Sequence, residues 1–397
     1  MLSEKYAAAA GQSSVIRELF EYGKQRAQIV GKDKVYDFSI GNPSVPAPDC
    51  VNDTAISLLK TMDPCKVHGY PSAVGYDDTR QVIAQNLNER YQMQYHKDNI
   101  FMTIGAASAI SLCFRVLTDA YKDDEIIVFA PYFPEYKCFI EGAGVKVVEV
   151  AADVSDFQIN FEQLEQSINE HTRAVIINSP NNPTGVVYSE ETIKHLAQVL
   201  EEASNRYGRP IYIISDEPYR EIVFDHKTVP YVPHYYKNTL VCYSYSKSLS
   251  IPGERVGYIA FTDEVADAEI MLGSIAAAAR ELGYVGVPSL FQMVVKDCDG
   301  EVSDISIYEK NRNLIYEALT DMGYSCVKPD GTFYIFPKCL KEDAASFCNR
   351  AKEYDLLLVP SDSFSCPGHF RMSYCVPTER VQNALPIFEK LISEYRN

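Results

Sequence analysis

Short runs of apolar, largely β-branched residues alternate along this chain with longer amphipathic segments. A helix is predicted from Ser189 to about Tyr207, because Ser189 can cap the first turn and apolar residues then recur on one face. Alternation of strand and helix predicts an α/β fold, in which helices cover both faces of a mostly parallel mixed sheet. The runs with the length and composition of buried strands are residues 99–105, 125–131, 145–150, 174–179, 210–216 and 239–246.

The pattern changes after about residue 290. A long helical stretch at about 304–322 precedes short apolar runs, which predicts a smaller α+β domain. The first 45 residues hold one expected helix, about 14–30, and one short strand, so we expect them to join that smaller domain. A chain of 397 residues is also longer than a domain with one hydrophobic core usually is, so we expect two domains. The small-domain strands are expected at 332–337, 356–361 and 369–376, and the predicted domains are 1–45 with 291–397 (small) and 46–290 (large).

Charge and composition exclude several classes of function. Fifty-four acidic against 37 basic residues give a formal charge of −17, which repels nucleic acid and anionic membranes. No apolar stretch is long enough to span a membrane, and the first residues lack the pattern of a signal peptide, so we expect a cytoplasmic protein. The 11 cysteines form no C-x-x-C pair, and the seven histidines show no ligand spacing, so we expect reduced thiols and no metal.

Polar and charged residues follow the ends of three predicted strands. Asn182 follows one strand, Asp216 ends the next, and Ser244 and Lys247 follow a third, with Arg255 soon after. Because ligands of α/β proteins bind beyond the carboxyl ends of the strands, these side chains should meet at one edge. Each alone is commonplace, as a turn former, a helix cap or a surface charge. Ser244 and Lys247 also match the S-x-x-K of penicillin-binding serine hydrolases, but no K-T-G accompanies them.

Taken in order, these motifs resemble the fold-type-I, pyridoxal-phosphate-dependent aminotransferases of class I/II, the aspartate aminotransferase superfamily. The resemblance covers nearly the whole chain. It implies a homodimer with active sites at the subunit boundary, pyridoxal 5'-phosphate as cofactor, and a small domain that closes over the substrate. The motifs are G-N-P at 41–43, Y-P-S-A-V-G-Y at 70–76, I-G-A-A-S at 104–108, P-Y-F-P at 131–134, N-N-P-T-G at 181–185, D-E-P-Y at 216–219, S-Y-S-K at 244–247 and R-M-S at 371–373.

The resemblance assigns the catalytic roles to Lys247, Asp216 and Tyr219. Lys247 matches the lysine that holds the cofactor as a Schiff base and shuttles a proton, which requires a neutral amine. Asp216 matches the partner of the cofactor's ring nitrogen. At contact distance and an effective dielectric near 20, such a pair interacts by about 6 kcal/mol, enough to keep the ring cationic. Tyr219 and Asn182 match groups that bond the O3′ oxygen, and Phe133 matches the ring stacked on the cofactor.

The resemblance also assigns a site for the cofactor's phosphate. Ser244, Ser246 and Arg255 match its ligands in the family, and Tyr70 matches a tyrosine that comes from the neighbouring subunit. A helix expected to begin near Ala106 would aim free N–H groups at the same dianion.

The turn before that expected helix departs from many relatives. Ala106 and Ala107 offer neither hydroxyl nor lysine, so we expect Gly105, Ala106 and Ala107 to bind the phosphate through their backbone. Ser108 can help only if its side chain faces inward.

The substrate site implied by the resemblance centres on Arg371. Arg371 matches the arginine that binds the α-carboxylate in a forked pair, and Gly41 lies where the family brings a backbone N–H to the same group. Asn182 also borders the substrate. Arg280 falls near the cross-subunit arginine that selects dicarboxylates, and the competing interpretation is a helix-surface arginine beside Glu281.

We therefore expect an aminotransferase that moves the amino group of an L-amino acid, aspartate or an aromatic one, to a 2-oxo acid such as 2-oxoglutarate. A carbon–sulfur β-lyase is the alternative, because relatives with the same cofactor apparatus eliminate instead of transaminating. A non-catalytic cofactor-binding regulatory module is a third hypothesis, which the acidic charge and the lack of a basic helix-turn-helix disfavour.

Overall fold

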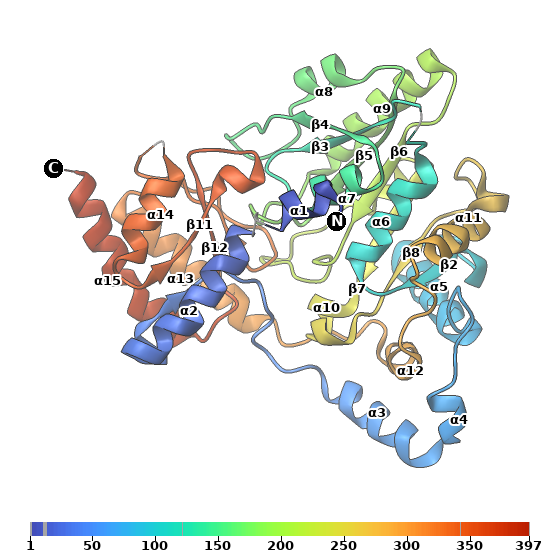
Figure 1. Ribbon diagram of the computed structural model, residues 1–397, viewed down its shortest axis with the longest axis horizontal. Helices are drawn as coiled ribbons and strands as arrows, with labels where there is room; N and C mark the ends of the chain where they lie inside the picture. Colours follow the sequence, from blue (N-terminus) through green and yellow to red (C-terminus); the bar gives the residue numbers. More distant parts are fainter. Residues whose placement is uncertain (1, 11–13, 121, 342, 397) are drawn as a thin grey trace.

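A seven-stranded sheet forms the centre of the computed structural model, which describes residues 2–10, 14–120, 122–341 and 343–396 (Figure 1). The strand order is β2-β8-β7-β6-β5-β3-β4, and every neighbouring pair is parallel except those of β8, which is antiparallel to β2 and β7. The α/β prediction is confirmed. The strands are β2 Ile100–Thr103, β3 Glu125–Phe129, β4 Lys146–Val150, β5 Thr172–Asn178, β6 Tyr212–Asp216, β7 Thr239–Ser244 and β8 Gly257–Ala260.

Both faces of this sheet are buried, which explains why its strands are continuous apolar runs. In β6, Ile213 packs with the core under helix α9, whereas Ile214 packs with the core under α6, α7 and α11. Ser189 caps α9 as predicted, because its Oγ accepts the Thr192 N–H at 3.0 Å. The helices around the sheet are α3 Asp49–Thr61, α4 Pro64–Val67, α5 Asp77–Tyr91, α6 Ala106–Leu117, α7 Glu135–Gly142, α8 Phe161–Ser167, α9 Glu190–Tyr207, α10 Tyr245–Ser248, α11 Ala268–Glu281 and α12 Ser289–Cys298.

All six predicted strands of this sheet form, but the sequence did not predict β8. β8 follows β7 after only the one-turn helix α10 and a 3₁₀ turn, so it departs from the alternation of strand and long helix on which the prediction rested. The predicted strand 239–246 is also shorter than expected, because β7 ends at Ser244 and the chain turns into the one-turn helix α10. Lys247 therefore lies on that helix.

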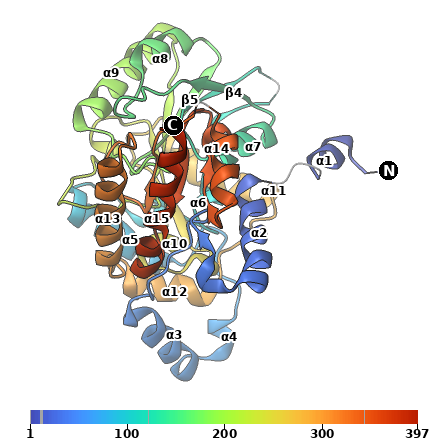
Figure 2. The same cartoon turned by 90° about the vertical axis from the view of Figure 1, so that its left-hand side faces the viewer.

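A second group of short strands lies beside the sheet, and we call it with its helices the small-sheet region (Figures 1 and 2). β11, β12 and β9 form an antiparallel sheet, and β1 pairs in parallel with β10. The predicted strand 356–361 thus divides between two partners. The elements are α2 Val15–Val30, β1 Tyr36–Asp37, α13 Ser306–Met322, β9 Tyr334–Ile335, α14 Ala344–Lys352, β10 Leu356–Leu357, β11 Val359–Pro360, β12 Phe370–Ser373 and α15 Thr378–Tyr395.

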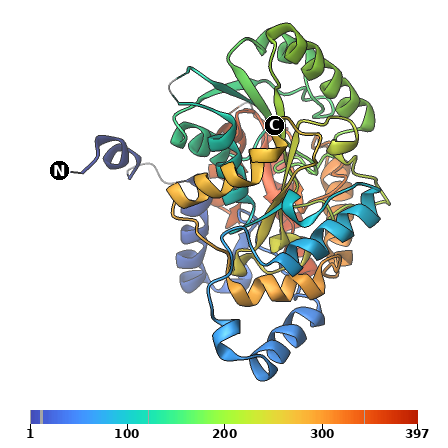
Figure 3. The same cartoon turned by 90° about the vertical axis from the view of Figure 1, so that its right-hand side faces the viewer.

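The β1–β10 pair attaches the N-terminal segment to the small-sheet region, and Tyr36 lies opposite Leu356. The predicted domain boundary at 290/291 falls inside α12, which packs on α3 and α5. The division into residues 1–45, 46–290 and 291–397 stays a prediction. The first helix, α1 Glu4–Ala9, stands away from the rest of the molecule (Figures 2 and 3). In the part of the chain described, no helix has the length and apolar character to cross a membrane.

Candidate active site

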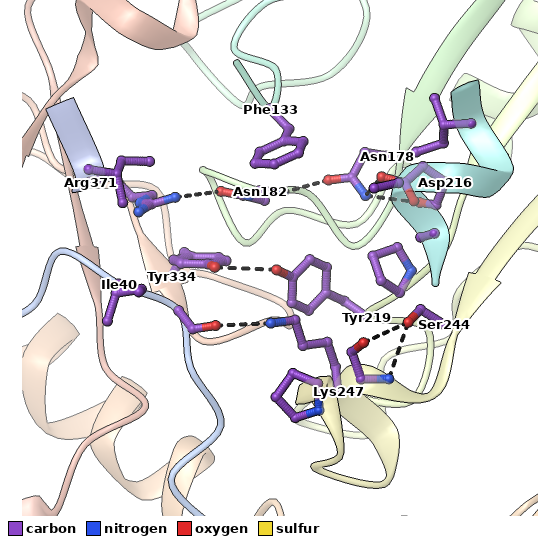
Figure 4. A pocket seen from close by; sticks show the side chains of 18 of the residues that line it. Ile40, Phe133, Asn178, Asn182, Asp216, Tyr219, Ser244, Lys247, Tyr334 and Arg371 are labelled. Atoms are coloured by element: carbon purple, nitrogen blue, oxygen red, sulfur yellow. Dashed lines mark hydrogen bonds between the residues drawn. The ribbon is translucent and has the colours of Figure 1, made fainter. Parts of the chain in front are cut away.

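A cavity of ≈ 280 Å³ lies between the carboxyl ends of the central strands and the small-sheet region (Figure 4). Most of the predicted site residues line it, although they come from segments far apart in the chain. Those that do are Gly41, Ala106, Ala107, Phe133, Asn182, Asp216, Tyr219, Ser244, Ser246, Lys247, Arg255 and Arg371.

Lys247 presents its amine at the middle of this cavity. Its Nζ donates a hydrogen bond to the Gly41 carbonyl at 2.9 Å, and the rings of Phe333 and Tyr219 lie within 6 Å. The pKa of Lys247 is lowered to about 8, chiefly by burial; the positive charges of Arg255 and Arg371 act in the same direction, whereas the Cys375 thiol acts in the opposite direction. A substantial fraction of this amine is therefore neutral near physiological pH, as a nucleophile or proton acceptor requires.

Ser244 and Lys247 do not form the nucleophile and base of a serine hydrolase. The Ser244 hydroxyl bonds the Ser246 hydroxyl at 2.8 Å, while Lys247 bonds Gly41. A nucleophilic serine needs its hydroxyl hydrogen-bonded to the base that removes its proton. The S-x-x-K interpretation is therefore disfavoured.

Asp216 lies at the end of β6 and is 5% exposed. The Tyr136 hydroxyl donates to its Oδ2, and the Asn178 amide donates to the same oxygen at 3.3 Å. No described residue donates to Oδ1, although that oxygen is buried. Burial raises the pKa of Asp216 to about 7, against the hydrogen bond from Tyr136. A cationic ring nitrogen beside Oδ1 would satisfy the unpartnered oxygen and lower the pKa again.

One end of the cavity is built to receive an anion. The Ser244 and Ser246 hydroxyls, the Arg255 guanidinium and the first turn of α6 meet there. Gly105 precedes α6 with φ +84°, and a Cβ at this position would lie 2.9 Å from Arg255 Nη2. The glycine thus allows the turn and the arginine to approach each other closely. Ser108 donates its hydroxyl to the Gly105 carbonyl at 3.0 Å, so its side chain is committed to the turn and does not line the cavity.

Arg371 lies on β12 at the opposite end and is 2% exposed. Its Nη1 donates to Asn182 Oδ1 at 3.2 Å and its Nη2 donates to the Ser39 carbonyl at 2.5 Å, whereas no described residue accepts from its Nε. Burial lowers its pKa. A buried cation with a free donor in a cavity wall can bind a carboxylate strongly, because charged hydrogen bonds strengthen in a low dielectric.

Three predicted residues do not line this chain's cavity: Gly105, which directly precedes α6, Tyr70 and Arg280. Tyr70 is fully exposed, and Arg280 is exposed near the end of α11. Both were assigned to the neighbouring subunit's site, so their roles stay predictions. The Glu281 carboxylate, next to Arg280 in the sequence, forms an ion pair with Arg115 instead, with 3.6 Å between Oε1 and Nη1.

Several residues of the site were not predicted from the sequence. Tyr334 on β9 lines the cavity, as do Ile16 from α2 and Ile40. Asn178 and Tyr136 contact Asp216. The P-Y-F-P motif could have pointed to Tyr136, which follows Phe133 by three residues and lies in the first turn of α7. The apolar residues carried no signal, because isoleucine occurs throughout the core.

These residues fit pyridoxal phosphate, a pyridine ring with an aldehyde and a phosphate. The buried Oδ1 of Asp216 suits the ring nitrogen, the amine of Lys247 suits the aldehyde, and the donors around Arg255 suit the phosphate. In the described part of the chain, no group of three or more histidine, cysteine or acidic side chains is arranged to hold a metal ion. Fold and site together define a pyridoxal-phosphate-dependent enzyme of the aminotransferase type.

Comparison with known proteins gives the family. The profile of the family "Aminotransferase class I and II" matches residues 33–388, and the chain belongs to this family. It is 31% identical to an aspartate aminotransferase of Thermotoga maritima, over 93% of this chain and 94% of that protein. The crystal structure of an aminotransferase from Eubacterium rectale is 55% identical, with a TM-score of 0.97 and full coverage of both chains. The protein is a pyridoxal-phosphate-dependent aminotransferase.

Proposed function

We propose that this aminotransferase moves the amino group of aspartate or an aromatic amino acid to 2-oxoglutarate. The observation that carries the proposal is Arg371, a buried arginine that lines the cavity and whose Nε has no acceptor among the described residues. An α-carboxylate bound there would be held within the same cavity as the Lys247 amine. Relatives with these substrates in their names support the proposal, among them the Thermotoga aspartate aminotransferase and a probable aspartate/prephenate aminotransferase of Aquifex aeolicus, also 31% identical.

The residues of the chain divide the chemistry between them. Arg371 binds the α-carboxylate and so orients the bond between the α-carbon and its proton. The neutral Lys247 amine removes that proton and later returns one. Asp216 would keep a proton on the ring nitrogen of the cofactor, and Tyr219 and Asn182 would hold the ring from the cavity wall. Pyridoxal phosphate, when bound, supplies a ring that accepts the electron pair left on the α-carbon.

Apolar residues of the cavity would contact the side chain of the substrate. Ile16 and Ile40 are apolar and suit an aromatic or aliphatic side chain. A second carboxylate needs a cation, and we assign that role to Arg280 of a second copy of the chain. A dicarboxylate acceptor and an aromatic donor would then use the same cavity.

This assignment requires a homodimer, which we propose on the exposure of Tyr70 and of apolar residues near it. Ile56 and Leu59 on α3 are about half exposed, as is Val285 after α11. A Cβ on Gly286 would lie 3.6 Å from Pro71 Cγ, so the segment after α11 lies against the Tyr70 segment. Exposed apolar side chains gathered on one side are typical of subunit interfaces. Light scattering of the purified enzyme should give the mass of two chains, and that of one chain would contradict the proposal.

We also propose that the enzyme is cytoplasmic. All 11 cysteines are free thiols, including Cys113 and Cys242, whose sulfurs lie 3.5 Å apart in the core. Thiols that stay reduced at such a distance are typical of a reducing compartment. Fractionation of the source cells should recover the activity in the cytosol.

A panel of amino acids mixed singly with the enzyme, without any oxo acid, tests the reaction. Aspartate, glutamate and tyrosine should remove the visible absorbance of the lysine-bound cofactor and release pyridoxamine phosphate. If no amino acid of a full panel does so, transamination is wrong. Release of pyruvate and ammonia from cystathionine without an oxo acid would identify the β-lyase instead.

Arg280→Ala tests the second carboxylate site. The variant should lose activity toward aspartate and 2-oxoglutarate while keeping its half-reaction with tyrosine. Arg206→Ala, on the exposed face of α9, is the control. Equal losses for acidic and aromatic substrates would contradict the assignment.

A further inference from the structure

Tyr334 is a polar residue of the cavity for which the sequence gave no role. It lies on β9 opposite Ser373 of β12. Arg371 precedes Ser373 by two residues, so the side chains of Tyr334 and Arg371 lie on the same face of the small sheet. Its ring centroid is 4.6 Å from the Arg371 guanidinium carbon. A guanidinium at this distance from an aromatic face is attracted to it, and the contact restricts the plane of the fork.

The hydroxyl of Tyr334 faces the other side of the site. It accepts a hydrogen bond from the Tyr219 hydroxyl at 3.3 Å, as Figure 4 shows. Tyr219 follows β6 three residues after Asp216, on the sheet side of the cavity. Tyr334 thus joins the arginine of one wall to the tyrosine of the other.

Gly41 leaves the space that this hydroxyl occupies. A Cβ on Gly41 would lie 1.8 Å from the Tyr334 hydroxyl oxygen, closer than any two unbonded atoms approach. The carbonyl of the same glycine accepts the hydrogen bond of Lys247. Gly41 therefore both leaves room for the Tyr334 hydroxyl and accepts the hydrogen bond of the Lys247 amine.

We propose that Tyr334 is a positioning residue that sets both the orientation of Arg371 and the share of the Tyr219 proton available to the cofactor. The inference rests on the proposed function, in which Tyr219 borders the phenolic oxygen of pyridoxal phosphate. Tyr219 has one O–H, and Tyr334 competes with that oxygen for it. Its ring acts on the substrate side and its hydroxyl acts on the cofactor side, so the two effects can be separated.

Tyr334→Phe removes the hydroxyl and keeps the ring. The proton of Tyr219 then goes wholly to the phenolic oxygen, which holds the proton beside the Lys247 nitrogen less strongly. In a pH titration of the holoenzyme's visible absorbance, the midpoint should fall by about half a unit, while the KM for the amino donor stays within about twofold.

Tyr334→Leu removes the ring as well. Arg371 loses the surface that fixes its plane, so the KM for the amino donor should rise about tenfold. The titration midpoint should match that of Tyr334→Phe, because the hydroxyl is absent from both. Circular dichroism establishes that each variant is folded.

Tyr308→Phe is the matched control. Tyr308 is a buried tyrosine in ring contact with Phe333, but its hydroxyl accepts the Ser44 N–H and it does not line the cavity. Its midpoint and KM should equal those of the wild type. An unchanged or raised midpoint in Tyr334→Phe would overturn the proposal for the hydroxyl, and an unchanged KM in Tyr334→Leu would overturn it for the ring. A wild-type enzyme without visible absorbance would instead overturn the proposed function.

Discussion

The two walls of the cavity differ in how the chain builds them. The strand-end group, Asn182, Asp216, Ser244, Ser246 and Lys247, comes from three neighbouring parallel strands in chain order. The small-sheet group, Ile16, Ile40, Gly41, Tyr334 and Arg371, comes from the two ends of the chain. We assign the first group to the cofactor and the second to the substrate. On this assignment, cofactor binding depends on the regular topology of the sheet, and substrate binding depends on contacts between segments far apart in the chain.

Lys247→Ala should produce the largest effect. It removes the group that bonds the cofactor and moves the proton, so kcat should fall by at least about 10⁴-fold and the visible absorbance should disappear. Lys194→Ala, which removes an exposed lysine paired with Glu190, is the control and should behave as wild type. If borohydride still fixes the cofactor to the variant, the strand-end group has been assigned wrongly.

Arg371→Leu should impair substrate binding without impairing cofactor binding, and so should distinguish the small-sheet group from the strand-end group. Loss of a forked, charged pair with the α-carboxylate should lower kcat/KM by about 10³-fold, while the visible absorbance remains. Steady-state kinetics and a spectrum of the same preparation are the measurements. Arg350→Leu, on the exposed side of α14, should lose little. Parallel loss of absorbance and activity in Arg371→Leu would mean that the small-sheet group also holds the cofactor.

The lowered pKa of Lys247 predicts a pH dependence for cofactor uptake. With the pKa near 8, the neutral fraction of the amine rises about tenfold per pH unit below 8 and levels off above it. The rate at which cofactor-free protein takes up pyridoxal phosphate should therefore rise nearly 10²-fold from pH 6 to pH 9. Stopped-flow absorbance measures this rate. A rate that is flat over this range would show that the amine is neutral throughout.

Tyr136→Phe should give the smallest effect. Without the hydroxyl that donates to Oδ2, the pKa of Asp216 rises further, and its charged pair with the ring nitrogen weakens. The dissociation constant of the cofactor should increase about tenfold, because one hydrogen bond to a buried carboxylate is lost. Tyr132→Phe is the control, since the Tyr132 hydroxyl bonds Ser365 and not Asp216. Equal cofactor affinities for wild type and Tyr136→Phe would show that the Tyr136 hydroxyl does not support Asp216 in binding the cofactor.

The sequence predicted the strand-end group well because a local rule connects each residue to its place. A strand that ends at Asp216 delivers that carboxylate to the edge where neighbouring parallel strands also end, so no knowledge of remote contacts is needed. The six strands of the large sheet were found for the same reason. The small-sheet group obeys no such rule. Arg371 and Gly41 were found through family motifs alone, and Tyr334 was missed because its place depends on its pairing with Ser373, which lies far away in the sequence.

The same difference explains the errors in the fold. The predicted strands of the large sheet have four to seven residues and are mostly buried, whereas β10 and β11 have two residues each. Strands this short owe their conformation to their partners, and composition cannot reveal the partners. The division of the predicted strand 356–361 between β1 and β12 is an example.

The buried Oδ1 of Asp216 has a consequence for the lifetime of the protein. A carboxylate oxygen without a donor destabilises the folded chain, and pyridoxal phosphate, which binds the folded chain, offsets this by about 2.7 kcal/mol when present at 100 times its dissociation constant. We therefore expect copies that lack the cofactor to be closer to unfolding and to be degraded sooner. Asp216, besides its proposed catalytic role, would then tie the abundance of the enzyme to the supply of its cofactor.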